Sequence, residues 1–307
     1  MEASVIIPAY NASSTLPATL SSIDEAAKFF GGSVETIVIE DKEGKGPSWA
    51  RNRALEKATG KYIFFCDADD TVEKEFFSRP ILEMEKTHSQ MCFFSYEGGP
   101  NLPEETVEGK ALVRERYLPA FFGYSIDDVR RWNKGGSLAE HKLPGQVWRC
   151  VFRRSFLEEN SLRFEEEMTF FEDAAFLSSC IASAEKVSSI PDRLYRYIPR
   201  PDGNLATGWR GKRNWEYKFL SLEFRRRLDA RHGGEIWKYC KASCVFSALE
   251  LLKARAGWRK YVSCDCVAEA IRDFPISMRH IVVAAAVLFL RLWNLKRAFP
   301  HQSHYAI

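Results

Sequence analysis

Three short apolar runs, rich in β-branched and aromatic residues, recur in the first 66 of the 307 residues. They are residues 3–9 (ASVIIPA), 34–39 (VETIVI) and 62–66 (YIFFC). Their length and composition are typical of buried strands. The two segments between them have the apolar spacing of helices, expected at 11–30 and 49–58. Strand and helix alternating at this spacing indicate an α/β fold with a mostly parallel sheet flanked by helices.

Polar residues stand where each of these three runs ends. The first is followed by PAYN at residues 8–11, the second by Glu40-Asp41, and the third by DADD at residues 67–70. Ligands of open α/β sheets bind beyond the carboxyl ends of the strands. The sequence therefore predicts one binding site at this edge of the sheet.

The rest of the chain extends this pattern. We expect further strands at 92–96, 146–152 and 187–197, and helices at 72–85, near 110–122 and from Phe171 onward. Residues 98–145 are rich in Gly, Pro and charge and are expected to form a long excursion, while the pattern from Trp215 onward is helical. This divides the chain into a domain of residues 1–200, with halves 1–97 and 98–200, and a helical C-terminal region of residues 201–307.

The acidic run at residues 67–70 predicts a metal site. Its three carboxylates raise one another's pKa unless a positive charge lies between them, and a divalent cation commonly supplies it. Oxygen ligands without nearby His or Cys favour Mg²⁺ or Mn²⁺, held by Asp67 and Asp69. For Asp70 and Thr71, a turn and a cap for the helix expected at 72–85 are equally good interpretations.

The same run also fits a second class of enzyme. Asp67-Ala68-Asp69-Asp70-Thr71 matches the DxDx(T) nucleophile motif of haloacid-dehalogenase-like phosphatases. That family also needs a downstream Gly-Asp motif, and the dipeptide Gly-Asp does not occur in this chain. A phosphatase is therefore the weaker alternative.

A longer resemblance covers residues 3–198. SVIIPAYNASSTLPATLSSI, IVIED and GPSWARNRALEKATGKYIFFCDADD, in this order, resemble the family 2 glycosyltransferases. Val147-Trp148 and the following FRRSFLEENSLRFEEEMTFFEDAAF resemble the acceptor half of the same family. The resemblance implies a Rossmann-like GT-A domain, here with a C-terminal helical extension. A relative that binds a nucleotide or glycan without catalysis remains an alternative.

The resemblance also implies a donor site for a nucleotide diphosphate sugar, with uracil favoured as the base. Asp41 would accept hydrogen bonds from the base, and Arg51 would approach the base or the phosphates. Asp67 and Asp69 would hold the ribose and the Mn²⁺ or Mg²⁺ that bridges the diphosphate. The donor-site residues implied in this way are Pro8, Tyr10, Asn11, Asp41, Arg51, Asp67, Ala68 and Asp69.

On the acceptor side, the resemblance implies inverting transfer of a hexose to a hydroxyl group of a glycan or lipid-linked glycan of the cell envelope. Asp173 would be the general base, and Glu172 and Trp148 would contact the acceptor. The residues alone leave simpler interpretations open. Glu172 and Asp173 suit the first turn of any helix, and Trp148 suits a core.

One departure from the family pattern concerns the donor base. Asp41 and Arg51 are only ten residues apart, bridged by KEGKGPSWA, where family members have a further helix and strand. We therefore expect a sheet that is one strand smaller, with a changed wall to the base pocket.

Charge is distributed unevenly along the chain. Residues 200–307 contain 20 Lys and Arg against nine Asp and Glu, which leaves 24 against 32 for residues 1–199. The basic stretches FRRRLDARH, LLKARAGWRKY and VLFLRLWNLKRAF within residues 215–307 suit helices on an anionic membrane surface. Packing of these helices on the first domain is the alternative, and no nucleic-acid-binding module is visible.

The cysteines and the apolar runs bear on location. The eight cysteines lie mostly within apolar runs, as reduced core cysteines do, and the longest apolar run, 281–290, is too short to span a bilayer. We expect a cytoplasmic protein, peripheral on the inner face of the membrane if the basic stretches bind there.

Overall fold

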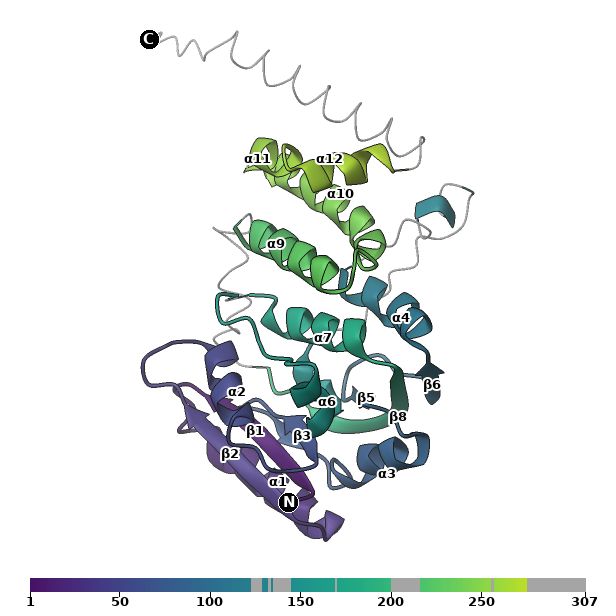
Figure 1. The fold of residues 1–307 in the computed structure, drawn as a ribbon. Coiled ribbons are helices and arrows are strands. Elements are labelled where there is room, and N and C mark those ends of the chain that lie inside the picture. The colour runs from purple at the N-terminus through teal and green to yellow at the C-terminus, as the bar shows by residue number, and fades with distance from the viewer. Residues whose placement is uncertain are drawn as a thin grey trace, which may run out of the picture. The chain divides into compact units, whose positions relative to one another are not determined.

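The computed structural model describes residues 1–122, 129–131, 134, 145–168, 170–199, 216–254 and 257–274 (Figure 1). The chain forms two compact units, Met1–Phe121 with Lys142–Ile236, and Phe122–His141 with Trp237–Ile307. The expected division at residue 200 falls in residues 200–215, which lie outside the described part. In the second unit, the described helices are α10 (Trp237–Ala254), α11 (Trp258–Val262) and α12 (Asp265–Arg272).

The first unit is built on a mixed sheet in the order β2-β1-β3-β7-β5-β8-β4, with β6 paired to β8. Strands β1 (Ala3–Ala9), β2 (Val34–Glu40) and β3 (Tyr62–Phe65) are parallel, with β2 at the edge. Helices α1 (Leu16–Phe30) and α2 (Pro47–Leu55) connect them. This alternation confirms the α/β fold and the three strands that the sequence predicts.

Gly60 explains how β3 comes close to β1. A Cβ at this position would lie 2.4 Å from the backbone nitrogen of Ser4, so only glycine fits. The Gly60 N–H donates to the Ser4 hydroxyl at 2.8 Å. The chain therefore enters β3 in contact with β1, which fixes where β3 ends.

The second half of the sheet is mixed. Strand β7 (Cys150–Arg153) is antiparallel to both β3 and β5 (Met91–Tyr96), and β5 is parallel to β8 (Lys186–Arg196). The short strands β4 (Thr71–Val72) and β6 (Glu105–Glu108) pair with β8. The remaining helices of this unit are α3 (Ser78–Thr87), α4 (Lys110–Phe122), the 3₁₀ helix η1 (Val147–Arg149), α6 (Arg154–Glu159), α7 (Glu172–Ser183) and α9 (Glu216–Arg231).

Two predicted elements differ from the structure. The helix expected at 72–85 is wrong at its start, because Thr71 and Val72 pair with β8 as a strand and the helix begins at Ser78. The strand expected at 146–152 begins four residues later, after η1. The sequence analysis also missed β6 and α6, which are too short to show a periodicity of their own.

An aromatic cluster forms the core where the two halves of the sheet meet. The Phe65 ring contacts Phe152, Phe164 and Phe176 edge-on, with ring centroids 5.5–6.0 Å apart. Phe164 stacks on Phe176 at 4.0 Å. Because these rings come from β3, β7, α7 and the segment before α7, the cluster fixes the end of β3 relative to the start of α7.

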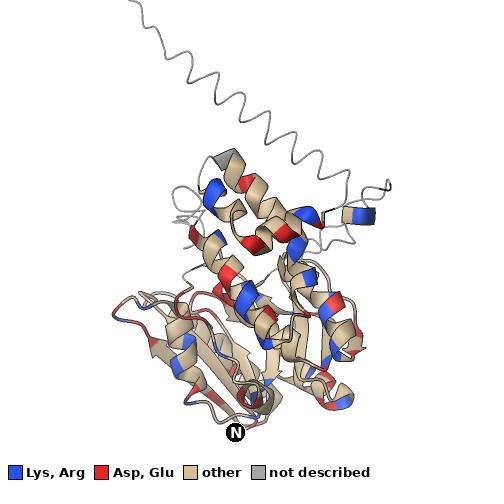
Figure 2. Cartoon of the chain, turned by 45° about the horizontal axis from the view of Figure 1, so that its top comes forward, with Lys and Arg blue, Asp and Glu red and all other residues tan. Residues whose placement is uncertain are grey.

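Helix α9 packs inside the first unit, next to the segment that precedes α7. Phe224, Arg225 and Leu228 are buried, and Arg227 pairs with Glu165 at 3.0 Å and Glu167 at 2.7 Å. Acidic and basic residues lie side by side on the described helices (Figure 2). Within FRRRLDARH, the apolar side chains of Phe224 and Leu228 are thus packed inside the unit, while Arg226 and Arg231 are exposed. Contact of this stretch with a membrane stays a prediction.

No helix among the described residues is long and apolar enough to span a membrane. LLKARAGWRKY covers the end of α10 and part of α11, and VLFLRLWNLKRAF lies outside the described residues. None of the eight cysteines, all of which lie in the described residues, forms a disulfide; Cys264 and Cys266 are half-buried and the other six are buried.

Arg149 is a buried charged residue that should lower the stability of the folded protein. Its side chain is fully buried, and none of its three guanidinium nitrogens has a hydrogen-bond partner among the described residues. Burial lowers its pKa to about 10. We expect Arg149→Met to raise the free energy of unfolding by about 1–3 kcal/mol, measured by urea unfolding, because methionine fills the space without the desolvation cost.

Arg153 provides the matched control. Its guanidinium donates to the carbonyls of Ser89 at 2.8 Å and Met84 at 2.7 Å, so Arg153→Met should lower the stability. A folded Arg149→Met protein that is less stable than the unsubstituted chain would contradict the account of Arg149.

Candidate active site

The sheet topology brings distant parts of the sequence to one edge. Tyr62 of β3 pairs with Arg153 of β7, and Ile63 with Phe152. Because the strands are antiparallel, the beginning of β7 lies beside the end of β3. The acidic run at 67–70 and η1 therefore meet at the edge that the sequence predicted, and the aromatic cluster places the start of α7 there too.

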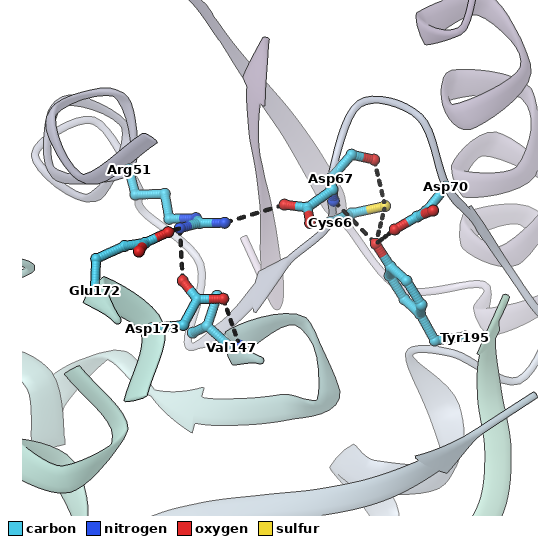
Figure 3. A network of polar contacts seen from close by, with 8 residues as sticks. All are labelled: Arg51, Cys66, Asp67, Asp70, Val147, Glu172, Asp173 and Tyr195. Carbon is cyan, nitrogen blue, oxygen red and sulfur yellow. Dashed lines mark hydrogen bonds and ion pairs between the residues drawn. The ribbon is translucent and has the colours of Figure 1, made fainter. Parts of the chain in front are cut away.

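Arg51 occupies the centre of this site (Figure 3). It projects from α2 and is only 3% exposed. One terminal nitrogen donates to Asp173 Oδ1 at 2.6 Å and lies 3.8 Å from Glu172 Oε1, and the other donates to Asp67 Oδ1 at 3.0 Å. Burial acts to lower the pKa of Arg51, but the charges of Asp173, Asp67 and Glu172 outweigh it and raise the pKa above its usual value.

Asp173 is held at both of its carboxylate oxygens. Oδ1 accepts from Arg51, and Oδ2 accepts from the backbone N–H of Val147 at 3.1 Å. Burial raises the pKa of Asp173 to about 6, with Glu172 acting in the same direction and Arg51 and Val147 N–H opposing it. At neutral pH Asp173 is thus an oriented carboxylate with a higher proton affinity than an exposed aspartate, as a general base requires.

The residue before this pair is strained. Phe171 has a φ of +72°, a left-handed conformation that is uncommon for a bulky residue. It starts α7, so Glu172 and Asp173 stand in the first turn of the helix. Such outliers persist where the surroundings over-determine them, and here the bend directs Asp173 towards Arg51. No sequence signal would have identified Phe171.

Tyr195 fixes the loop after β3, a role that the sequence analysis missed. Its hydroxyl accepts from the Asp67 N–H at 3.0 Å and donates to Asp70 Oδ2 at 2.7 Å. The other oxygen of Asp70 accepts from Ile198 N–H at 2.8 Å. Asp70 is buried, and burial raises its pKa to about 7. The expected helix cap at Asp70 is therefore wrong, since Asp70 joins the loop to the end of β8.

Asp67 and Asp69 are the accessible carboxylates of the loop. Asp67 is about a third exposed; burial raises its pKa to about 6, with Arg51 opposing the rise and Asp173 and Asp69 adding to it. Among the described residues, no group of three or more His, Cys, Asp or Glu is arranged to hold a metal ion. Mg²⁺ and similar ions need only one or two carboxylates when a diphosphate supplies the other ligands, so Asp67 and Asp69 fit such an ion together with a substrate.

The predicted donor residues lie along the same sheet edge. At the end of β1, Tyr10 is 53% exposed and Asn11 has a φ of +49°, which asparagine tolerates well. Pro8 is half-buried, and the buried Ala68 accepts a bond from the Thr15 hydroxyl at 2.8 Å through its carbonyl. Tyr10 thus offers a ring to a ligand, while Asn11 also has a conformational reason to be there.

Asp41 stabilises the short loop between β2 and α2. Its carboxylate accepts from the N–H groups of Lys45 at 3.0 Å and Gly46 at 2.7 Å. Burial acts to raise its pKa, but backbone N–H groups of residues 43–46 outweigh it and lower the pKa. Gly44 and Gly46, with φ of +71° and +97°, allow the turn. Asp41 is thus bound to its own loop.

Trp148 corrects a prediction. It is 3% exposed, stacks on Tyr195 at 4.1 Å with the rings 7° from parallel, and contacts Tyr96 edge-on at 4.9 Å. Its ring is therefore part of the core and offers no face to an acceptor. Glu172 is partly exposed beside Asp173 and keeps its place in the site.

Comparison with known proteins connects this site to a family. Residues 24–136 match the family model "Glycosyl transferase family 2". The chain is 27% identical to "Uncharacterized glycosyltransferase EpsJ" of Bacillus subtilis, covering 65% of this chain and 61% of that protein. It is 22% identical to "Poly(ribitol-phosphate) beta-N-acetylglucosaminyltransferase TarS" of Staphylococcus aureus, covering 66% of this chain and 36% of that protein. The chain thus spans less than two thirds of the length of these two relatives.

Solved structures share the fold of this chain. The crystal structure of S. aureus TarS 1–349 covers all of this chain and 94% of its own, with a TM-score of 0.58 and 16% identity. A complex of the same fragment with UDP-GlcNAc gives the same TM-score. At this level of identity the likeness shows a common GT-A fold.

The buried carboxylates make the stability depend on pH. Asp70 has a pKa of about 7 in the folded chain against an ordinary 3.8, so the folded state binds this proton more tightly than the unfolded state. Its contribution is fully present below about pH 4 and is lost as the pH rises through 7. We expect the stability of Asp70→Asn, measured by urea unfolding without metal, to exceed that of the unsubstituted chain by only about 1–2 kcal/mol at pH 5, where the loss has begun. At pH 8 it should be more stable on the order of 2–4 kcal/mol.

Asp24→Asn on the exposed face of α1 is the control and should follow the unsubstituted chain at both pH values. Equal stability of the Asp70→Asn and unsubstituted chains at pH 8 would show that ionised Asp70 is accommodated without cost.

Proposed function

We propose that this chain, which belongs to glycosyl transferase family 2, transfers a hexose from a UDP-sugar to a hydroxyl group of a glycan or lipid-linked glycan with inversion. One observation carries the proposal. Asp173, the residue suited to be the base, and Asp67, the residue suited to the donor diphosphate, lie within one hydrogen-bonded network through Arg51. A transferase needs both functions at one place, because the acceptor attacks the carbon that the diphosphate leaves.

The acceptor half of the reaction rests on Asp173. Its carboxylate takes the proton from the acceptor hydroxyl as that oxygen attacks the anomeric carbon. The bond to the UDP oxygen breaks on the opposite face of the sugar, so the configuration inverts. A pKa of about 6 leaves Asp173 ionised at neutral pH while keeping its proton affinity above that of an exposed aspartate.

The donor half rests on the ends of β1, β2 and β3. The exposed Tyr10 ring offers a stacking surface for the base, with Pro8, Asn11 and the backbone at Ala68 beside it. Asp41 holds its loop against this edge and keeps further lone pairs for the base. A divalent cation, Mn²⁺ or Mg²⁺, held by Asp67, Asp69 and the diphosphate would stabilise the charge that develops on the leaving UDP.

The choice of UDP and of the acceptor class is supported by relatives. S. aureus TarS is named a poly(ribitol-phosphate) beta-N-acetylglucosaminyltransferase and has been solved with UDP-GlcNAc. A third relative, the "Succinoglycan biosynthesis protein ExoO" of Rhizobium meliloti, is 24% identical and covers 98% of this chain. We extend the proposal to an acceptor of the cell envelope, with peripheral membrane contact through the basic stretches beyond α9.

Replacement of the proposed base tests the reaction. Asp173→Asn keeps the shape of the side chain but removes its proton affinity, so turnover of a UDP-sugar should fall by about 10²–10⁴-fold. UDP affinity, measured by calorimetry with Mn²⁺, should stay within about threefold. Asp24→Asn is the control for turnover. Full turnover in Asp173→Asn would exclude this residue as the base.

Removal of a proposed metal ligand tests the donor site. In Asp69→Ala, UDP binding should lose the part that depends on Mn²⁺, because only Asp67 remains to hold the ion beside the diphosphate. UDP binding in EDTA should not change. If the affinity gained on adding Mn²⁺ were the same in both proteins, the metal would not be bound by Asp69.

A further inference from the structure

Arg51 has a different environment from the one that the family resemblance implies for it. As a donor ligand it would face the diphosphate or the base from an open pocket. In the structure it is 3% exposed, and both terminal nitrogens are directed at carboxylates. Its Nε atom is buried and has no hydrogen-bond partner in the described part of the chain, and its guanidinium lies 5.3 Å from the centre of the Phe164 ring. The protein therefore contacts the guanidinium at both terminal nitrogens and at the Phe164 ring.

The next residue fixes Arg51 in this position. The Asn52 amide donates to the Phe164 carbonyl at 3.0 Å, and its oxygen accepts from the Phe164 N–H at 2.9 Å. The same amide donates to Glu166 at 2.9 Å. Asn52 thereby ties α2 to the segment that leads into α7. Because Arg51 and Asn52 are adjacent, the two hydrogen bonds between the Asn52 side chain and the Phe164 backbone also fix the position of the Arg51 backbone relative to Asp173.

From this geometry we propose that Arg51 is a positioning residue, which orients the base Asp173 and links it to Asp67 on the donor side. It fixes one oxygen of Asp173, and the Val147 N–H fixes the other. The carboxylate plane is then set by two independent elements, α2 and η1. The inference rests on the proposed role of Asp173 and replaces the donor contact that the resemblance implies for Arg51.

The charges around Asp173 make the effect measurable. Within the described residues, three charged groups face it: Arg51 from α2, Glu172 from its own helix, and Asp67 from the loop after β3. Arg51 is the cation among them and holds the pKa of Asp173 down against burial. Without this cation the pKa of Asp173 rises, and activity that needs the ionised base is lost at a higher pH.

The experiment uses the full chain and a panel of UDP-sugars with Mn²⁺, following UDP released by transfer to water. Arg51→Lys retains the charge without the two-pronged geometry, and Arg51→Met removes both. Arg53→Met is the matched control, since Arg53 lies two residues along α2, is exposed and pairs only with Glu56 in the described structure.

We expect Arg51→Lys to lower kcat by about 10–100-fold, because the base loses its alignment. KM for the donor and Kd for UDP should stay within about threefold. In Arg51→Met the acidic limb of the kcat profile should move to higher pH, and Arg53→Met should behave as the unsubstituted chain. In an Asp173→Asn background, Arg51→Lys should cause no further loss, because it acts through Asp173.

Each other outcome has a definite meaning. A tenfold rise in KM and in Kd for UDP at unchanged kcat would make Arg51 a donor ligand and overturn the inference. A loss of kcat of the same size in both backgrounds would overturn it as well, because Arg51 would then act independently of the base. If Arg51→Met does not fold, Arg51→Lys and the double substitution decide. If the unsubstituted chain binds UDP but releases none from any donor, the proposed function fails, and the inference fails with it.

Discussion

The contact of the Phe65 ring with three other phenylalanines determines where the functional groups of this molecule meet. Phe65 is the last residue of β3, and its neighbours come from β7, from α7 and from the segment before α7. The acidic loop begins two residues after Phe65, and Asp173 lies three residues before Phe176. A few ångströms of sliding between these rings would separate the donor carboxylates from the base. The catalytic geometry is thus set by apolar packing, which is stiff because the core is close-packed.

The carboxylates of the site are electrostatically unfavourable in the folded protein. Asp67, Asp173 and Asp70 are carboxylates in poorly solvated surroundings, and burial raises the pKa of all three. One buried arginine cannot neutralise three carboxylates, so the region keeps an excess of negative charge. A divalent cation held by Asp67 and Asp69 would remove part of this excess. The same negative charge that destabilises the protein at high pH would therefore favour binding of such a cation.

The sequence predicted the parts of this arrangement that depend on local pattern. Apolar runs and their polar ends located β1, β2, β3 and the sheet edge, since burial of a strand leaves its mark on consecutive residues. The partners of Arg51 could not be predicted, because Asp173 is 122 residues away and the contact depends on the antiparallel pairing of β7 with β3. The roles of Tyr195 and Phe171 also depend on the folded structure and not on local sequence pattern. An apolar strand sequence hides a hydroxyl that bonds across the sheet, and a phenylalanine gives no sign of a left-handed backbone.

The short connection between β2 and α2 depends on one carboxylate. A turn of this kind must satisfy its own backbone N–H groups, and Asp41 does this for Lys45 and Gly46. The aspartate that the resemblance assigns to the nucleotide base is therefore also the residue that folds the loop. These two tasks are compatible, because each carboxylate oxygen has a second lone pair. They also make the loop sensitive to the ligand, since a base that pulled on Asp41 would act directly on the two glycines that form the turn. The tight turn at the edge where we propose that the donor binds thus depends on one side chain for its conformation.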